Sequence, residues 1–263
     1  MKETVLVTGS TSGIGKAIAD RLAGQGCNLI LVSRDADRLG AQCRELQGRH
    51  GIHASFVALD LSVPGAAQKV FETVQGRGES VQILVNNAGF NEAGEFLHTD
   101  GKRETEMISL HAVFPTEMMK LFIPSMVEDG YGRVLNVGST GSFMPCPHDA
   151  VYAATKAYVL SVSRGINAEL KKTGVRVTVL CPGSTRTRFA ERAGLDNTWL
   201  FRLFVMDAAD VAAAGCRALK RGRDYVVPGV YNRMLVLSSR ILPFFITGFL
   251  AKMMLKTTPR RLH

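Results

Sequence analysis

Short aliphatic runs alternate along the chain with longer segments in which apolar residues recur at helical spacing. The aliphatic runs predict seven strands, at residues 5–8, 29–33, 54–58, 83–86, 134–137, 175–180 and 225–227. The helical segments lie near residues 14–25, 35–49, 66–77, 100–129, 151–172 and 208–221. Strands that are apolar almost throughout are typical of parallel sheets covered on both faces. The alternation therefore predicts an α/β fold: a doubly wound, mostly parallel, seven-stranded sheet with helices on both faces.

The composition fits one large domain. The chain has 263 residues, of which 46% are hydrophobic, enough to bury a sizeable core. We assign residues 1–230 to this domain and residues 231–263 to a C-terminal helical extension. The five cysteines are scattered and odd in number, which predicts reduced thiols in a cytoplasmic protein and neither disulfides nor a metal site. The first strand follows Met1 almost at once, so we expect no signal peptide.

A glycine-rich turn follows the first predicted strand and opens the first predicted helix. It reads Thr8-Gly9-Ser10-Thr11-Ser12-Gly13-Ile14-Gly15. Glycine allows a tight turn and a close approach of the backbone to a ligand, while a helix N-terminus offers free N–H groups and partial positive charge. A P-loop needs four residues between its glycine and Gly-Lys, whereas five separate Gly9 from Gly15-Lys16. The turn therefore predicts a site for a dinucleotide diphosphate.

A tyrosine and a lysine four residues apart form a second candidate site. Tyr152 and Lys156 share one face of a predicted helix, and Ser139 lies upstream at the end of a predicted strand. A free phenol titrates near ~10, so a tyrosine that acts as acid or base needs a fixed cation nearby. We expect the Lys156 ammonium to favour the anionic phenol. The three side chains therefore predict proton transfer to or from a substrate oxygen.

Five motifs occur in the order and spacing of the short-chain dehydrogenase/reductase family, which the chain resembles over roughly residues 4–229. They are the glycine-rich turn, Asn86-Asn87-Ala88-Gly89, Ser139, Tyr152-x-x-x-Lys156, and Pro182-Gly183 followed by Thr187. The resemblance implies a Rossmann domain that binds a nicotinamide cofactor beside a Ser-Tyr-Lys centre. It also implies a homo-oligomer.

The same resemblance implies where the cofactor lies. The expected cofactor-binding residues are Gly9, Ser10, Thr11, Gly13, Ile14, Gly15, Ser33, Arg34, Asp60, Leu61, Asn87, Ala88, Gly89, Tyr152, Lys156, Pro182, Gly183 and Thr187. Residues 87–89 should line the adenine-ribose side, and Asp60 with Leu61 should hold the adenine edge. Thr187 should contact the nicotinamide carboxamide. Tyr152 is the expected proton donor, Ser139 polarises the carbonyl, and Lys156 also bonds the nicotinamide ribose.

The residues after the second strand predict the type of cofactor. NAD sites place an acidic side chain there to bond the ribose 2′-hydroxyl, whereas NADP sites offer arginine. This chain has Ser33-Arg34. A guanidinium can bind a 2′-phosphate through paired hydrogen bonds, and a carboxylate would repel it, so we predict NADP(H).

His111 departs from the family pattern. The family usually has asparagine at this place, thirteen residues before Pro124, where it completes a proton relay through a water. Pro115 has no N–H to donate to the carbonyl of His111, so that oxygen is left free for such a water. We therefore include His111 in the catalytic set, and a packed histidine without a role stays an alternative.

Apolar side chains are dense between Thr187 and Asp207, where the family places its substrate-facing lid. They are Leu195, Trp199, Leu200, Phe201, Leu203, Phe204 and Val205. Such a segment suits an apolar ketone or alcohol, although packing of the lid on the core would use the same residues. Residues 146–148 precede Tyr152 and are candidates for the border of the same pocket.

The last 33 residues combine an apolar run with basic residues and no acid. Six of the nine excess positive charges lie there, at Arg233, Arg240, Lys252, Lys256, Arg260 and Arg261. The apolar run over residues 241–251 is shorter than the ~20 residues that cross a bilayer. A cover over the substrate cleft, a subunit contact and a peripheral membrane contact through residues 240–256 all fit this pattern. Nucleic acid does not, because the other 26 of the 32 basic residues nearly balance 23 acids.

These patterns predict an NADP(H)-dependent oxidoreductase that interconverts a ketone and a secondary alcohol, with an apolar substrate of steroid or acyl type. The alternative is a non-catalytic NADP-binding sensor or scaffold, attached to a membrane or partner by its C-terminal extension. The presence of Ser139, Tyr152 and Lys156 favours the enzyme. A sugar-nucleotide epimerase would need a larger substrate domain after Thr187 than this chain has.

Overall fold

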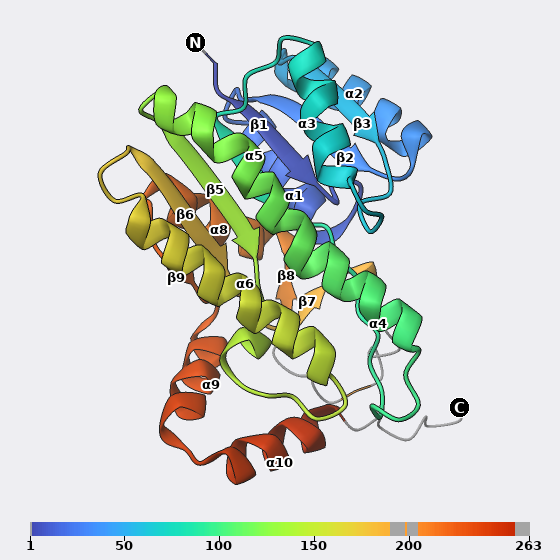
Figure 1. Ribbon diagram of the computed structural model, residues 1–263, viewed down its shortest axis with the longest axis vertical. Coiled ribbons are helices and arrows are strands. Elements are labelled where there is room, and N and C mark those ends of the chain that lie inside the picture. Colours follow the sequence, from blue (N-terminus) through green and yellow to red (C-terminus); the bar gives the residue numbers. More distant parts are fainter. Residues whose placement is uncertain (1, 190–197, 199–204, 256–263) are drawn as a thin grey trace.

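The computed structural model describes residues 2–189, 198 and 205–255. Its centre is a sheet whose seven strands are all parallel, in the order β3-β2-β1-β4-β5-β6-β9 (Figure 1). The strands are β1 (Thr4–Thr8), β2 (Asn28–Ser33), β3 (Ala54–Ala58), β4 (Ile83–Asn86), β5 (Gly132–Val137), β6 (Val175–Leu180) and β9 (Tyr225–Val226). The strand order reverses between β1 and β4, which creates the crevice where ligands of such sheets bind. The predicted fold class is confirmed.

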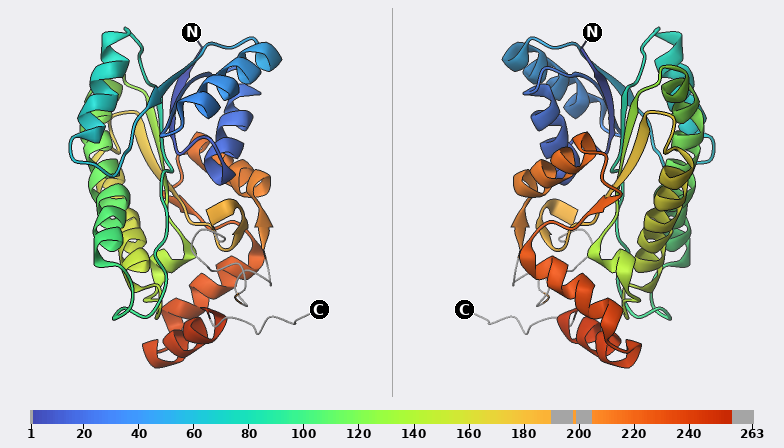
Figure 2. Two further views of the ribbon diagram at one scale, coloured as in Figure 1. Left: turned by 90° about the vertical axis from the view of Figure 1, so that its right-hand side faces the viewer. Right: turned by 90° about the vertical axis from the view of Figure 1, so that its left-hand side faces the viewer.

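The helices form one layer on each face of the sheet (Figure 2). One layer consists of α1 (Gly13–Ala23), α2 (Ala36–His50) and α8 (Ala208–Lys220), and the other of α3 (Ala66–Gly76), α4 (Gly101–Ile108), α5 (Phe114–Glu128) and α6 (Ala150–Glu169). Successive residues of a strand point to opposite faces, so β1 supplies both cores. Val5 and Val7 pack toward the α1 side, and Leu6 packs toward the α5 side. This double coverage explains why the strands are apolar throughout.

The helix predicted over residues 100–129 is interrupted in its middle. A π-helical turn, Ser109–Val113, separates α4 from α5, and the Phe114 N–H bonds to the Ser109 carbonyl. Pro115 follows in the first turn of α5 and cannot donate the bond that a regular helix would need. Single π-turns of this kind are frequent at functional sites, and His111 lies in this one.

A small second sheet was not predicted. It pairs β7 (Thr185–Arg186) with β8 (Met206–Asp207), and both strands are too short to show a hydrophobic period. They bracket the segment predicted to be the lid. Apart from Val205, the apolar residues expected in that lid lie outside the described residues.

The C-terminal extension consists of α9 (Val230–Ile241) and α10 (Phe244–Leu255), which lie beyond the carboxyl ends of the strands (Figure 1). α9 is tied to the domain, because Val236 is buried against Val159 and Val179. Within residues 2–189, 198 and 205–255, no helix is both long enough and apolar enough to cross a bilayer.

Candidate active site

The glycine-rich turn between β1 and α1 is packed too closely for larger residues. Gly9 has a φ of +65°, and a Cβ on Gly15 would lie 2.3 Å from the Gly9 carbonyl oxygen. The Asn87 Nδ2 donates to the carbonyls of Thr8, at 2.9 Å, and Gly9, at 3.1 Å. Asn87 thus holds the shape of the turn from the neighbouring loop after β4.

The N-terminus of α1 is open to an anion. Ser12 precedes the helix, but its side chain makes no capping bond, and the first turn contains no acid. The Ser10 hydroxyl is buried and has no hydrogen-bond partner among the described residues. Backbone N–H groups at a helix start, together with an unpaired hydroxyl, are the donors that a diphosphate requires. The residues present therefore fit the diphosphate of a dinucleotide.

Arg34 and Asp60 lie past the ends of β2 and β3. The Arg34 Nη1 is 3.8 Å from the Asp60 Oδ2, and the Arg34 side chain is 72% exposed. Burial raises the pKa of Asp60, but hydrogen bonds from Ser62 and the Arg34 charge outweigh it and hold the pKa below its ordinary value. Asp35 is turned away, because it caps α2 by accepting from the Arg38 N–H. Arg34 is therefore the charged group left facing outward after β2.

Ser139, Tyr152 and Lys156 come together where β5 ends. Ser139 begins a short 3₁₀ helix, Thr140–Phe143, and its Oγ accepts from the Gly141 N–H at 3.1 Å. Its side chain is also hydrogen-bonded to Tyr152. The Lys156 Nζ lies 5.6 Å from the centre of the Tyr152 ring and donates to the Val137 carbonyl at 3.0 Å. The predicted cluster is thus formed, with the lysine anchored to the sheet.

The surroundings of Tyr152 keep its hydroxyl protonated. Burial raises the pKa of Tyr152, the nearby Asp149 charge raises it further, and the hydrogen bond with Ser139 lowers it. The Lys156 ammonium, bonded to Val137, does not reverse this balance. The predicted lowering of the Tyr152 pKa is therefore wrong for the chain by itself, because desolvation of the phenolate outweighs the cation.

Lys156 is buried enough to be close to titration. Lys156 is 6% exposed, and burial lowers the pKa of its ammonium group to about 8. The neighbouring Cys181 acts in the opposite direction. Near neutral pH the ammonium is therefore easier to deprotonate than an ordinary lysine.

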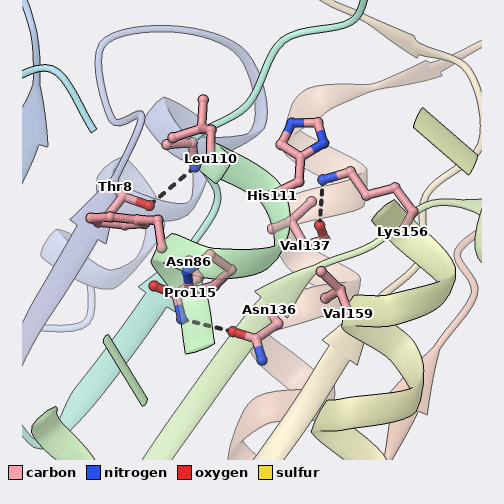
Figure 3. Close-up of a pocket in the computed structure, with 11 residues that line it drawn as sticks. Thr8, Asn86, Leu110, His111, Pro115, Asn136, Val137, Lys156 and Val159 are labelled. Carbon is pink, nitrogen blue, oxygen red and sulfur yellow. Dashed lines mark hydrogen bonds between the residues drawn. The ribbon is translucent and has the colours of Figure 1, made fainter. Parts of the chain in front are cut away.

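His111 lies beside Lys156 at a small buried cavity (Figure 3). Burial, and then the Lys156 charge, hold the pKa of His111 well below its usual range, so the ring is neutral. The Thr155 hydroxyl donates its one hydrogen to the Tyr152 carbonyl at 2.7 Å. The His111 Nδ1, 3.0 Å from the Thr155 Oγ1, must then be the donor of that pair. Its Nε2 carries the lone pair and is buried without a partner among the described residues.

Two asparagines that are paired on the neighbouring strands β4 and β5 line the same cavity (Figure 3). The Asn86 Nδ2 donates to the Asn136 Oδ1, and the Asn136 Nδ2 donates to the Ser163 hydroxyl, each at 2.8 Å. The chain of bonds ties α6, which carries Tyr152 and Lys156, to β4 and β5. The sequence analysis missed Asn136 and Ser163. An asparagine inside an apolar strand was the signal available.

Asp149, three residues before Tyr152, was also missed. It stands at the N-cap of α6, yet its side chain makes no capping bond. Burial raises the pKa of Asp149 to about 6, against a lowering by the Asn91 side-chain hydrogen bond. The preceding His148 has a φ of 64°, and its carbonyl accepts from the Gly94 N–H at 2.8 Å. An acid before a helix resembles an ordinary cap in sequence, so its burial beside the tyrosine could not be foreseen.

The loop after β6 lies against both ends of the site. The Pro182 carbonyl accepts from the Thr140 N–H at 2.8 Å, next to Ser139. A Cβ on Gly13 would lie 3.0 Å from the Thr187 methyl group, so Thr187 contacts the glycine-rich turn. The Phe189 ring is 5.9 Å from the Tyr152 ring. Gly183 packs against α9, where a Cβ would lie 2.2 Å from the Asn232 Oδ1.

The predicted site residues thus follow one edge of the sheet in three groups. Ser33, Arg34, Asp60 and the buried Leu61 lie past β2 and β3. The glycine-rich turn and residues 87–89 lie past β1 and β4, and the Ser-Tyr-Lys cluster lies past β5. This order can hold an extended dinucleotide with its reactive end beside Tyr152.

Known proteins resemble this chain in both sequence and architecture. A sequence model of short chain dehydrogenases matches residues 3–198. Sulfoacetaldehyde reductase of Chromohalobacter salexigens is 36% identical over 191 residues, which cover 72% of this chain and 75% of that protein. A short-chain dehydrogenase from Sphingobium yanoikuyae, solved in complex with NADPH, has a TM-score of 0.80 at 29% identity and covers 99% of this chain and 98% of its own.

A second solved structure, the bulky-bulky ketone specific alcohol dehydrogenase from Comamonas testosteroni, has a TM-score of 0.77 at 28% identity, with 91% of this chain and 92% of that one covered. The family match includes the glycine-rich turn, Ser139, Tyr152 and Lys156. Because the family model matches most of the chain, the chain belongs to the short-chain dehydrogenase/reductase family and is an enzyme acting on CH–OH groups.

Proposed function

We propose that the enzyme interconverts a ketone and a secondary alcohol with NADP(H). The observation that carries the proposal is the meeting of Ser139, Tyr152 and Lys156 at the sheet edge that also bears the uncapped N-terminus of α1. The bound nicotinamide supplies or accepts the hydride. The chain's own residues bind it, hold the carbonyl and move the proton.

Tyr152 is the proposed proton donor in reduction. Its protonated hydroxyl, kept so by burial, can give a proton to the carbonyl oxygen as negative charge develops there. Ser139 is the second donor to the same oxygen. In oxidation the phenolate takes the proton back. Lys156 has three N–H donors, and Val137 uses one, so two remain for the nicotinamide ribose and the phenolate.

We propose that His111 accepts a hydrogen bond in the path that returns a proton to Tyr152. The support is its bare, buried Nε2 beside Lys156. A packed histidine without this role is the alternative. The pH–rate profile of His111→Ala decides between them, since an unchanged profile removes His111 from the path.

The substrate is proposed to be an apolar ketone or alcohol of steroid or acyl type. Phe189 lies beside the Tyr152 ring, and the related Comamonas enzyme is named for bulky ketones. NADP(H) is supported by the exposed Arg34 and by the NADPH complex of the Sphingobium relative.

The test is a panel of ketosteroids, acyl ketones and quinones with NADPH, followed by absorbance loss. Tyr152→Phe should lower kcat/KM at least ~10²-fold, the lower bound for a general acid, with NADPH affinity nearly unchanged. Tyr158→Phe is the matched control, because that tyrosine is on the same helix, is 43% exposed and should leave activity intact. Substantial activity in Tyr152→Phe refutes the mechanism. NADPH binding by a wild-type protein that turns over no substrate would support the sensor instead.

We also propose that the enzyme is a cytoplasmic homo-oligomer in which residues 231–263 extend the 1–230 domain. Apolar side chains are exposed on the outer face of α4 to α6, at Ile108, Val113 and Tyr158, each 43–48% exposed. A subunit contact would cover them. Sedimentation velocity of the full chain measures the oligomeric state, and a monomer would contradict the proposal.

A further inference from the structure

One face of α9 is an apolar stripe that points into solvent. Val230, Met234, Leu237 and Ile241 are spaced by four, three and four residues, so they share one helix face. They are 72%, 65%, 59% and 73% exposed, respectively. The other face is the one that packs on the domain, where Val236 is 5% exposed. The packing of α9 on the domain therefore does not use this stripe.

α10 continues the exposed apolar surface. Its sequence, FFITGFLAKMML, contains one charged residue, and an apolar helix of this kind is normally buried on all sides. Here α10 lies at the outer end of the molecule, beside α9 (Figures 1 and 2). Phe245 is 74% exposed and Phe249 is 63% exposed. We define the C-terminal patch as Val230, Met234, Leu237, Ile241, Leu242, Phe245, Phe249 and Met253, all at least 37% exposed.

The exposure and the charge of the region narrow the partners that fit the patch. The patch faces solvent, so its partner lies outside the chain, whatever the opposite, buried face of α9 and α10 covers. No acid follows Asp224 in the sequence, while six basic residues do, among them the exposed Arg233 and Arg240. A two-fold contact would place this surface against its own copy and bring like charges together. An anionic lipid surface offers an apolar layer and the opposite charge.

We propose that the C-terminal patch docks the enzyme on an anionic bilayer and lies within one leaflet. α10 has 12 residues, a length of ~18 Å at the helical rise, against a hydrocarbon thickness of ~30 Å. The extension therefore rests in the interface and does not cross it. Docking turns the carboxyl edge of the sheet, where Tyr152 lies, toward the lipid. The consequence that an apolar ketone reaches the site from the bilayer rests on the proposed function.

Vesicle flotation of the full chain tests the docking without any activity readout, so its failure is distinct from failure of the proposed function. Vesicles of phosphatidylcholine alone and with phosphatidylglycerol are compared at low and high salt. The double variant Phe245→Ala/Phe249→Ala is compared with Val127→Ala/Tyr131→Ala, a pair that is 36% and 37% exposed at the opposite end of the sheet, where α5 ends and β5 begins. The circular dichroism spectrum and Tm report whether each variant folds, which removal of exposed side chains should not alter.

The expected result is flotation with anionic vesicles, weakened by salt. Loss of both phenyl groups should lower the affinity roughly tenfold or more, and the Val127/Tyr131 control should float like the wild type. Absence of wild-type flotation on anionic vesicles, or equal flotation of the patch variant, overturns the proposal. So does a patch variant that changes only the oligomeric state in sedimentation velocity, because the patch would then be a subunit contact.

Discussion

At the scale of single residues, Tyr152 stands between an acid and a base on the same helix. Asp149 precedes it by three residues at the N-cap of α6, and Lys156 follows it by four, a spacing that brings helical side chains to one face. Burial, and then the Asp149 charge, stabilise the protonated phenol, while the Ser139 hydrogen bond stabilises the phenolate. The acidity of the proton donor is therefore set by this competition and not by Lys156 alone.

We predict that Asp149→Asn shifts the pH dependence of alcohol oxidation to lower pH. Oxidation needs the phenolate, so its rate rises with pH up to the apparent pKa of Tyr152. Removal of the carboxylate lowers that pKa, and the rising limb of kcat/KM should move down by roughly one pH unit. Below pH 6 wild type and variant should converge, because Asp149 has a pKa of about 6 and is then neutral. Asp149→Glu keeps the charge and should retain the wild-type limb; an unmoved limb in the asparagine variant would contradict the argument.

Arg34 gives a prediction about cofactor choice. Arg34→Asp replaces a group that can bind a 2′-phosphate by one that repels it, so the NADP/NAD ratio of kcat/KM should fall by at least ~tenfold. Arg38→Asp is the matched control, because Arg38 is a neighbouring exposed arginine paired with Asp35. Equal ratios in wild type and Arg34→Asp would show that other residues recognise the 2′-phosphate.

Residues named by a motif were predictable, and residues defined by their surroundings were not. Tyr152, Lys156 and Gly9 carry their roles in type and spacing, and the structure brings them to one edge. The burial of Asp149 and the bare Nε2 of His111 depend on neighbours more than 40 residues away in sequence, Asn91 for the first and Thr155 for the second. The direction of the Tyr152 pKa was mispredicted for the same reason, since desolvation belongs to the folded chain.

At the scale of elements, the strands were predictable because both faces of each are buried, which leaves a clear apolar run. The interruption of the long helix was not, because a π-turn has no sequence period of its own. Pro115 was the one local sign of it. The β7–β8 pair was also not predicted, since two-residue strands are too short to show an alternation of apolar and polar residues. Elements with long, regular patterns are thus fixed locally, and the short ones depend on tertiary context.

The first turn of α1 provides a test at this scale. A Cβ on Gly15 would lie 2.3 Å from the Gly9 carbonyl oxygen, so Gly15→Ala must open the glycine-rich turn and should abolish most NADPH binding. Gly165→Ala is the matched control, because Gly165 lies inside α6 with nothing within 4 Å of an added Cβ. It should raise the free energy of unfolding by ~0.5–1 kcal/mol and leave binding intact. NADPH titration by fluorescence and thermal unfolding of both variants decide; tight binding by Gly15→Ala would mean that the turn does not hold the diphosphate.

At the scale of the whole molecule, the residues of the candidate site are concentrated at one end. The cofactor edge, the Ser-Tyr-Lys cluster and the extension all lie past the carboxyl ends of the strands (Figure 1). Among the described residues, the opposite end contains strand starts and connecting turns. The sheet and its two helix layers supply the stability of the fold. Burial of the charged and polar groups of the site costs part of that stability.

Lys156 should make that cost measurable in the stability of the whole chain. Its pKa is about 8 in the folded protein, against an ordinary 10.5, so burial of the ammonium opposes folding below pH 8 by about 3 kcal/mol. Between pH 8 and 10.5 the unfolded chain binds the proton that the folded chain has lost, so wild-type stability rises with pH across this window. Lys156→Met should therefore be more stable than wild type at pH 7, less the lost bond to Val137, and the difference should shrink toward pH 10.5. Chemical denaturation across pH 7 to 10.5 measures it, with the exposed Lys120→Met as control. A stability difference that does not change with pH would show that burial of the charged Lys156 does not lower the free energy of unfolding.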